Sequence, residues 1–444
     1  MTDLRRSLTL FDVTMIAIGG TIGGGIFLTP SLVAGALPSP ALILAAWAVG
    51  GLMALSGALT FSELAALLPR AGGQYAYLTE AYGGLVGFLF GWAYFLVVNA
   101  GGLGALSVGF ATYFGYFVPL GPAGIKAVAI CGLLLLTTIN VVGVKAGAIF
   151  SDLFTVLKIA GIVAMVAVGL GFGSPHTTTG WLATGPVPDG LATGLATAMV
   201  GVLWSIGGWQ HATYASAEVR NPRRTLPRAM VIGTAVVTAI YLSVNVAYLF
   251  LMTPQEIAAS PRVAAEAVSR VFGTAGGSAI SLAIFVSTFG VVGIYTLTAP
   301  RIYFAMASEG LFFRKVAEVH PRFQTPAVAI AAQSLWAVVL ILFWGTFESL
   351  ISYVVFTDWI FFGLAAASVF IFRRRMPDAE RTVRVPLYPI TPIFFVAMSA
   401  WFVAVTLLAR PAQAWAGILF LALGVPVYFY WKRRRDARQA LPPG

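Results

Sequence analysis

The feature that most constrains this chain is the length of its apolar stretches. Residues 84–118 contain no charged side chain, and residues 11–37 and 41–67 contain one each. An apolar helix of roughly 20 residues crosses the hydrocarbon core of a bilayer. Only 10% of the residues are charged, against about 25% in a soluble domain. The sequence therefore predicts an all-α integral membrane protein.

Twelve apolar stretches follow one another along the chain. They cover approximately residues 11–37, 41–67, 84–118, 124–144, 149–172, 191–215, 228–252, 277–307, 327–344, 350–372, 387–408 and 411–431. Of the 27 Lys and Arg residues, 22 fall on the side of the two termini, four on the other side, and Lys158 within a span. Cytoplasmic loops are enriched in Lys and Arg, so this bias predicts cytoplasmic termini. It also accounts for the net charge of +11 by topology and anionic lipid, without a nucleic-acid surface.

The middle of the first span has a composition that disfavours a helix. Five glycines fall within residues 19–25, and each costs roughly 1 kcal/mol relative to Ala in a helix interior. We expect the helix to unwind here, which a membrane tolerates only where the backbone is buried in protein or lines a cavity. The alternative is a close helix–helix crossing through small residues.

A second glycine pair, Gly207-Gly208, interrupts the sixth span. Breaks five spans apart are typical of an inverted-topology repeat with a substrate site at the two breaks. We expect repeats over about residues 11–172 and 191–372, with extra helices at about 387–431. All of these lie in one transmembrane domain over residues 1–444, which these features predict to be a transporter.

Unwound helices expose backbone groups that bind charges. The N–H groups of Gly23, Gly24 and Gly25 suit a carboxylate, and carbonyls near residues 20–22 and 204–206 suit an ammonium group. A ligand with both groups on adjacent carbons is an α-amino acid. The middles of the third and eighth spans carry no charged residue, which favours a neutral side chain. Trp204 is expected either to cover the ligand or to pack.

Two charged residues lie deep within spans, Lys158 and Asp358. Lys158 costs roughly 3 kcal/mol at such depth, and we expect its ammonium group to bind freed carbonyls of the first span and a hydroxyl, Ser287 or Thr288, in place of Na⁺. The alternatives are a structural pin and a proton carrier. Asp358 is expected to pair with an Arg or cap a polar network, with substrate contact as a further alternative. We expect the run Arg373–Arg375 to be solvated.

Other function classes have little support. The single cysteine, Cys131, permits no disulfide within the chain. No zinc motif, phosphate-binding loop or nucleophile–base cluster occurs, so we expect no catalytic residue, no metal site and no cofactor. A channel or sensor would need rings of charge or a signalling domain. Within transport, a proton-coupled amino acid symporter and a polyamine or amine carrier remain as alternatives to an amino acid carrier that is independent of ions.

Several motifs in order resemble those of the amino acid–polyamine–organocation transporters, most closely the L-type amino acid transporters and their bacterial relatives. The resemblance rests on residues 19–27 (a G-x-x-I-G-S-G-I-F type motif), 61–64, 69–77, 80–83, 207–209, 218–227, 287–290, 301–310 and 424–429. It covers nearly the whole chain. It implies a LeuT-type fold of twelve helices with discontinuous helices 1 and 6, alternating access in a prokaryotic plasma membrane, and Na⁺-independent transport, commonly exchange.

The resemblance also implies specific contacts. Substrate would contact Ile22, Gly23, Gly24, Gly25, Trp204, Ser205 and Gly207, and Lys158 would occupy the sodium-site region beside Gly19 and Ser287. Three residues depart from the family pattern: Gly24 where Ser is frequent, Trp204 where Phe is frequent, and Asp358 where a neutral residue is frequent. Residues 115–124 contain no cysteine, so we expect no disulfide-linked single-span partner.

Overall fold

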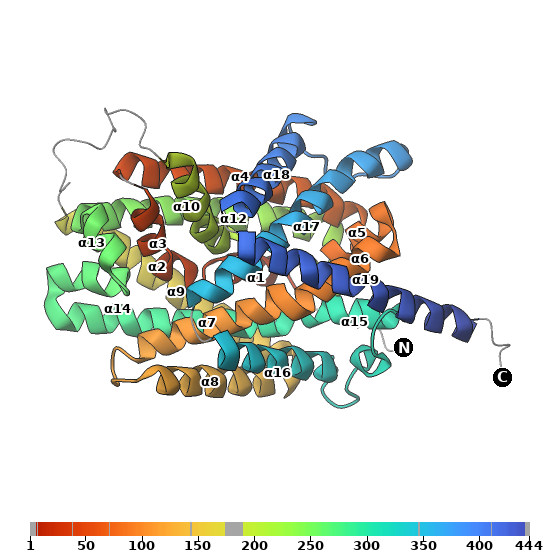
Figure 1. Cartoon of the computed structure of the whole chain (residues 1–444), viewed down its shortest axis with the longest axis horizontal. Coiled ribbons are helices and arrows are strands. Elements are labelled where there is room, and N and C mark those ends of the chain that lie inside the picture. The colour runs from red at the N-terminus through yellow and green to blue at the C-terminus, as the bar shows by residue number, and fades with distance from the viewer. Residues whose placement is uncertain are drawn as a thin grey trace.

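The structure, a computed structural model, describes residues 6, 8–37, 39–70, 72–142, 144–173, 190–344, 347–409 and 411–439. Within these ranges the regular elements are helices joined by turns and loops, an isolated bridge links Leu8 and Val219, and there is no strand. Figure 1 shows the long helices running roughly along one direction. This observation confirms the all-α class that the apolar stretches predict.

The first part of the chain forms nine α-helices and one π-helical turn. In order they are α1 (Leu10–Thr21), α2 (Gly25–Leu28), α3 (Pro30–Ala36), α4 (Pro40–Leu67), α5 (Gln74–Tyr82), α6 (Gly84–Ala93), η1 (Tyr94–Val98), α7 (Asn99–Phe114), α8 (Pro122–Val142) and α9 (Val144–Phe172). The first predicted span is thus divided into three short helices. The π-helical turn η1 joins α6 to α7 within the third span, which the sequence analysis did not predict.

The second part contains another broken helix and the C-terminal pair. Its elements are α10 (Leu191–Ile206), α11 (His211–Tyr214), η2 (Ser216–Glu218), α12 (Pro222–Leu251), α13 (Pro254–Ala259), α14 (Val263–Thr298), α15 (Pro300–Ser308), η3 (Arg314–Ala317), α16 (Ala327–Trp344), α17 (Phe347–Arg375), α18 (Ile390–Ala409) and α19 (Pro411–Gln439). α14 bends at Gly273, where φ is +61°. α19 continues through the basic segment that follows the twelfth predicted span.

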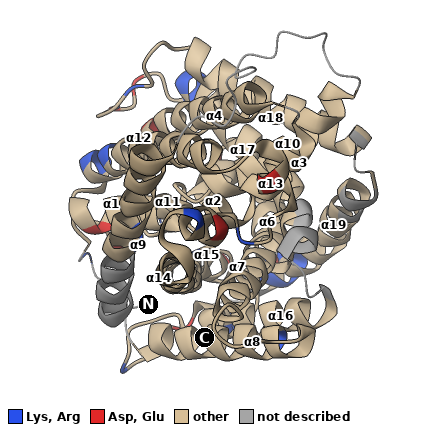
Figure 2. Ribbon diagram, turned by 90° about the vertical axis from the view of Figure 1, so that its left-hand side faces the viewer, with Lys and Arg blue, Asp and Glu red and all other residues tan. Residues whose placement is uncertain are grey.

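Nine helical stretches in the described ranges are long and apolar enough to cross a membrane. Two further apolar helices, over 191–206 and 327–343, are shorter. The first of them is short because α10 ends at the Gly207 break. Figure 2 shows few charged residues among the helices. The chain is a multi-pass membrane protein, and the count of twelve spans stays a prediction.

The helices pack so that both broken segments lie inside the bundle. α1 packs on α12 and α9, α14 packs on α7 and α9, and α17 lies against α7 and α10. α18 and α19 follow α17 at the outside (Figure 1). α1 is buried along most of its length: its residues 16–21 are all buried. This burial places irregular backbone away from lipid, as a membrane requires.

We call the end of the bundle at which the described chain starts and α19 ends the basic end, because the sequence assigns 22 of the 27 Lys and Arg residues to the side of the termini. The start of the described chain and the end of α19 both lie there (Figure 1). Arg5 and Arg410, used in the charge comparison, lie outside the described residues. At the basic end, Glu63 is 1% exposed and accepts hydrogen bonds from Arg373 at 2.9 and 2.7 Å and from the Val385 amide at 2.8 Å. The expectation that Arg373 is only a solvated charge is therefore wrong.

Candidate functional site

The two helix breaks meet inside the bundle. α1 ends at Thr21 and α2 begins at Gly25, while α10 ends at Ile206 and α11 begins at His211. Gly208 has a φ of +119°, and a methyl group there would collide with the carbonyl oxygen of Gly20. Glycine is therefore needed at position 208 both for the backbone conformation and for the close approach of the two chains.

Some glycines of the first stretch serve helix crossing rather than unwinding. A methyl group on Gly25 would lie 2.6 Å from the Ser205 hydroxyl oxygen, and one on Gly19 would lie 2.5 Å from the Thr155 hydroxyl oxygen. The two interpretations of the glycine stretch thus apply to different residues: the helix stops after Thr21, and the flanking glycines allow neighbouring helices to approach.

Lys158, on α9, binds the end of α1. Its side chain is 2% exposed, and its Nζ atom donates hydrogen bonds to the carbonyl oxygens of Gly19, at 3.0 Å, and Ile22, at 2.7 Å. The Tyr241 hydroxyl donates to the carbonyl oxygen of Thr21 at 2.9 Å. A helix C-terminus is the negative end of the helix dipole, so the ammonium group stabilises it. Among the described residues Lys158 has no acidic partner.

Ser287 lies on α14, and its position differs from the expected arrangement. Its side chain is buried, and its hydroxyl forms no hydrogen bond with any described group, Lys158 included. The neighbouring Thr288 hydroxyl donates to the carbonyl oxygen of Ile284, within its own helix, at 2.9 Å. The ammonium group of Lys158 is therefore held by the two carbonyls of the α1 end, and neither hydroxyl of α14 contributes a bond.

The start of α2 offers unpaired donors. The N–H groups of Gly24, Gly25 and Ile26 donate to no acceptor in the described part of the chain, as expected where a helix begins. Gly23 instead donates to the carbonyl oxygen of Thr21 at 2.8 Å. Two of the three glycine amides expected to bind a carboxylate are thus available, and the third is used within the break.

Ser205 joins the two broken helices. Its hydroxyl donates to the Gly201 carbonyl at 2.8 Å and lies 2.8 Å from the hydroxyl of Thr29, which precedes α3. The side chain is 1% exposed. Ser205 therefore fixes α10 against the segment that follows α2.

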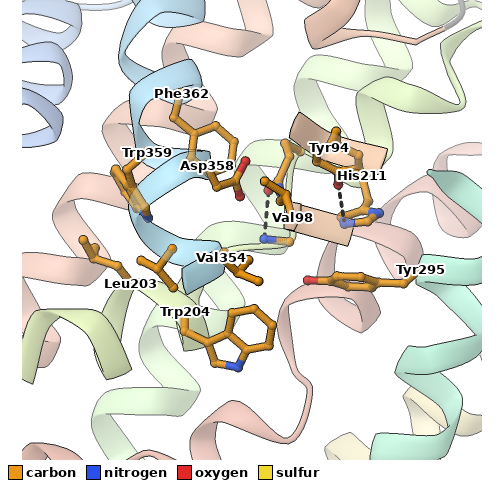
Figure 3. Close-up of a pocket in the computed structure, with 14 residues that line it drawn as sticks. Tyr94, Val98, Leu203, Trp204, His211, Tyr295, Val354, Asp358, Trp359 and Phe362 are labelled. Atoms are coloured by element: carbon orange, nitrogen blue, oxygen red, sulfur yellow. Dashed lines mark hydrogen bonds between the residues drawn. The ribbon is translucent and has the colours of Figure 1, made fainter. Parts of the chain in front are cut away.

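A small cavity lies beside the second break (Figure 3). It is lined by Tyr94 and Val98 of η1, by Leu203, Trp204, Gly207, Gly208, Gln210 and His211 around the break, by Tyr295 of α14, and by Val354, Val355, Asp358, Trp359 and Phe362 of α17. Of the residues expected to contact substrate, Trp204 and Gly207 line it. Ile22, Gly23, Gly24, Gly25 and Ser205 are not among the residues that line this cavity.

Hydrogen bonds fix the polar groups of η1 and α11. Thr298 donates to the carbonyl oxygen of Ile294 at 2.8 Å and lies within hydrogen-bonding distance of Nδ1 of His211. Thr298 therefore accepts from Nδ1–H, which leaves Nε2 of His211 to accept from the Tyr94 hydroxyl at 3.4 Å (Figure 3). The arrangement holds His211 as one neutral tautomer.

Sequence reasoning missed most of the cavity lining. Tyr94 and Val98 face it because of the π-helical turn, a feature frequent at functional sites that carries no clear sequence signature. His211 had a usable signal, since it follows the Gly207-Gly208 break by three residues. Asp358 was noted as an intramembrane charge, but it lines the cavity and has no arginine partner among the described residues.

The chain is similar to known amino acid transporters over nearly its whole length. The family model described as amino acid permease matches residues 8–428. The serine/threonine exchanger SteT of Bacillus subtilis is 33% identical over 436 residues, which cover 97% of this chain and 98% of that protein. The b(0,+)-type amino acid transporter 1 of Mus musculus is 29% identical over 98% of this chain and 91% of its own length. The large neutral amino acids transporter small subunit 2 of Homo sapiens is 30% identical over 97% of this chain and 82% of its own length. The chain therefore belongs to the amino acid permeases of the amino acid–polyamine–organocation superfamily, close to the L-type transporters.

Proposed function

We propose that this permease exchanges neutral L-amino acids across the membrane by alternating access, without Na⁺. The observation that carries the proposal is the ammonium group of Lys158 on the carbonyl oxygens of Gly19 and Ile22, at 3.0 and 2.7 Å. A fixed cation occupies the C-terminal end of α1, where a bound metal ion would otherwise offset the negative end of the helix. The names of the relatives, a serine/threonine exchanger and a transporter of large neutral amino acids, agree with this substrate class.

We further propose that bound substrate contacts the backbone of both helix breaks. The free amides of Gly24 and Gly25 are suited to the substrate carboxylate. The carbonyl groups of Ser205 and Ile206, at the end of α10, accept no hydrogen bond in the described structure and suit the α-ammonium group. Ile22, Gly23 and Gly207 complete the backbone frame, and Trp204 closes over the side chain. Gly19 and Ser287 belong to the region where Lys158 replaces a cation.

The architecture that goes with this function has twelve spans. We propose an inverted repeat of the LeuT type over residues 11–172 and 191–372, with helices over 387–431 outside it. Breaks after Thr21 and Ile206 support this relation, since they interrupt the first and sixth spans. We also propose that both termini are cytoplasmic in a prokaryotic plasma membrane, because 22 of the 27 basic residues lie on their side. We propose that the permease works without a disulfide-linked single-span partner, because residues 115–124 contain no cysteine.

The test is uptake of a labelled neutral L-amino acid into liposomes that contain the purified protein. Uptake is measured in Na⁺-free buffer, with and without unlabelled amino acid inside, and with and without an inward proton gradient. Exchange predicts uptake that requires internal amino acid and is insensitive to the gradient. Uptake into empty liposomes that rises with the gradient would instead establish proton symport. Transport of amines without transport of any amino acid would overturn the substrate assignment.

A further inference from the structure

A groove at the outside of the bundle lies between α6, η1, α19 and the segment that follows α15. Figure 1 shows α19 running beside α6 toward the basic end. The groove has a volume of about 570 Å³, which is in the range of ligand sites. Six of the residues that line it are aromatic: Trp92, Phe95, Phe312, Phe313, Tyr430 and Trp431. Its wall is therefore suited to an apolar ligand.

The groove changes from apolar to basic along α19. Val427, Tyr430, Trp431 and Arg434 line it at spacings of three and four residues, so one face of this helix forms the wall. Arg434 belongs to the basic run Lys432–Arg435, which follows the twelfth predicted span. Among the described residues it is the one charged side chain that lines the groove. The groove is therefore an apolar surface with a cation at the end of a span.

Arg434 has no counter-charge in the described part of the chain. Its Nη1 atom donates to the Tyr430 hydroxyl at 3.2 Å, and it forms no ion pair there, whereas the next residue, Arg435, pairs with Asp436 at 3.1 Å. The guanidinium group of Arg434 therefore keeps donors for an anion from outside the protein. Phosphate is an anion that guanidinium groups bind with paired hydrogen bonds.

The bilayer contains molecules with both of the features that the groove requires. The side chains of Phe313 and Tyr430 are 61% and 56% exposed, so the groove is open to its surroundings. Trp and Tyr gather where a membrane meets water, and basic residues directly beyond a span attract anionic lipids. A soluble anion would leave the aromatic wall uncovered. An anionic phospholipid brings an acyl chain to the wall and a negative charge to Arg434.

The groove and the cavity beside the second break share η1. Phe95 and Leu96 of this five-residue turn line the groove, while Tyr94 and Val98 line the cavity. A ligand that packs on one face of the turn loses these contacts when the turn moves. It therefore favours the conformation in which the other face lines the cavity.

We propose that the groove binds one anionic phospholipid, with an acyl chain along the aromatic wall and the headgroup phosphate on Arg434, and that the bound lipid holds η1 in the conformation that lines the cavity. The lipid-binding part of this inference is independent of the proposed function. The effect through η1 rests on the proposed function, because it is measured as a change in amino acid exchange.

Binding is measured by native mass spectrometry of the full-length protein in detergent. The protein is titrated with dioleoylphosphatidylglycerol or with dioleoylphosphatidylcholine, which has the same acyl chains and no net charge. The wild type should bind the first lipid more tightly. Arg434→Gln should raise the dissociation constant for phosphatidylglycerol about tenfold more than Arg433→Gln does. Arg433 is the matched control, because it is exposed in the same basic run but does not line the groove.

A second variant tests the aromatic wall. The ring of Phe313 lies 5.1 Å from that of Trp431, between centroids, and its exposure makes Phe313→Ala a change outside the core. This variant should raise the dissociation constant for phosphatidylglycerol about threefold or more, because the acyl chain loses apolar contact. Phe343→Ala, on α16 at a side chain that is 83% exposed, should leave it unchanged.

Three results would overturn the lipid site. Equal losses of affinity in Arg434→Gln and Arg433→Gln would show that the basic run attracts anionic lipid without a defined site. Competition by glycerol 3-phosphate at concentrations as low as those of the lipid would make the ligand a soluble phosphate. A wild-type dimer that Phe313→Ala converts to monomers would show that a second copy of the chain occupies the groove.

The effect on η1 is measured as exchange of a labelled neutral amino acid in phosphatidylcholine liposomes with and without phosphatidylglycerol. The wild type and Arg433→Gln should exchange faster when phosphatidylglycerol is present, and Arg434→Gln should lose this stimulation. Lipid binding without stimulation of exchange would overturn the role of η1. Absence of exchange in every lipid would contradict the proposed function and would leave the binding result standing.

Discussion

At the scale of single residues, Lys158 shows what a sequence can and cannot predict. A lysine about nine residues into a span can be identified from the sequence as a candidate functional residue, because a charge at that depth is costly. That it would bind freed carbonyls of the first span followed from the glycine break. The hydroxyl partner did not follow, because the direction of the Ser287 side chain depends on how α14 turns against α9. Tyr241, which donates to Thr21, has no local signal at all.

Replacing Lys158 by alanine should disable the carrier. The carbonyl oxygens of Gly19 and Ile22 would lose their partner in a buried site, which costs about 1–3 kcal/mol. We expect exchange to fall by about tenfold or more and the thermal unfolding temperature to drop. Lys126→Ala is the matched control, because that partly exposed lysine also donates to a backbone carbonyl, of Leu342, at 2.8 Å. Exchange by Lys158→Ala at more than half the wild-type rate would contradict an organising role.

At the scale of elements, glycine content predicted where two helices break but not how the breaks fit together. The gap between Thr21 and Gly25 and the gap between Ile206 and His211 both fall on glycine clusters, because glycine weakens a helix and permits unusual φ angles. The contact between Gly20 and Gly208 depends on the tertiary arrangement. The π-helical turn that brings Tyr94 and Val98 to the cavity was not predicted, since its residues are ordinary helix formers for a membrane.

Gly208→Ala should therefore destabilise the protein far more than a glycine-to-alanine substitution at an uncrowded position. At a φ of +119°, a residue with a side chain costs about 1–3 kcal/mol of strain, and its methyl group would also collide with Gly20. Gly171→Ala is the control, because it lies on α9 with no atom within 4 Å of the added methyl group. The free energy of unfolding of Gly171→Ala should equal that of the wild type or exceed it by up to about 1 kcal/mol. Thermal unfolding followed by size-exclusion chromatography of the solubilised proteins tests both, and equal stability of the two variants would count against the contact.

The short helix α13 should give the protein a measurable response to acid. Arg270 donates to Glu256 at 2.8 and 3.1 Å, and these hydrogen bonds, with the Thr253 amide, lower the pKa of Glu256 from 4.5 to about 2. Because the folded-state pKa is lowered, the stabilisation is present above about pH 4.5 and is lost as the pH falls toward about 2. Glu256→Gln should unfold at a slightly lower temperature than the wild type at neutral pH, since the side chain is 42% exposed and solvent screens the pair.

This difference between Glu256→Gln and the wild type should close as the pH is lowered. Glu380→Gln, at a side chain that is 82% exposed, controls for the loss of one surface charge. If the difference in unfolding temperature between Glu256→Gln and the wild type stays the same from neutral pH to about pH 3, Glu256 does not cause the pH dependence of stability.

At the scale of the whole molecule, hydropathy predicted an all-α membrane protein and charge bias predicted the common side of the termini. The ion pairs at the basic end were not predictable from the sequence, since their partners lie far apart along the chain. Glu218 accepts from Arg301 at 2.8 Å, and both side chains are nearly buried. The first described segment joins them, since the Leu8 amide donates to the Glu218 carbonyl and the Arg220 amide to the Leu8 carbonyl, each at 2.9 Å. Tyr75 adds a bond to Glu309 at 2.6 Å.

Alternating access requires this end of the bundle to open, so the pair of Glu218 with Arg301 should control opening. Glu218→Gln leaves the guanidinium group buried without a counter-charge, a cost of about 3–5 kcal/mol that opening to water relieves. We expect faster labelling by a polar maleimide of a cysteine placed at Val219, which is fully buried, in a Cys131→Ser background. Glu80→Gln removes an exposed pair with Arg70 at the same end and should leave the labelling rate unchanged. If Glu218→Gln lowers the unfolding temperature but does not change the labelling rate, the pair is a static support and the opening of this end is governed elsewhere.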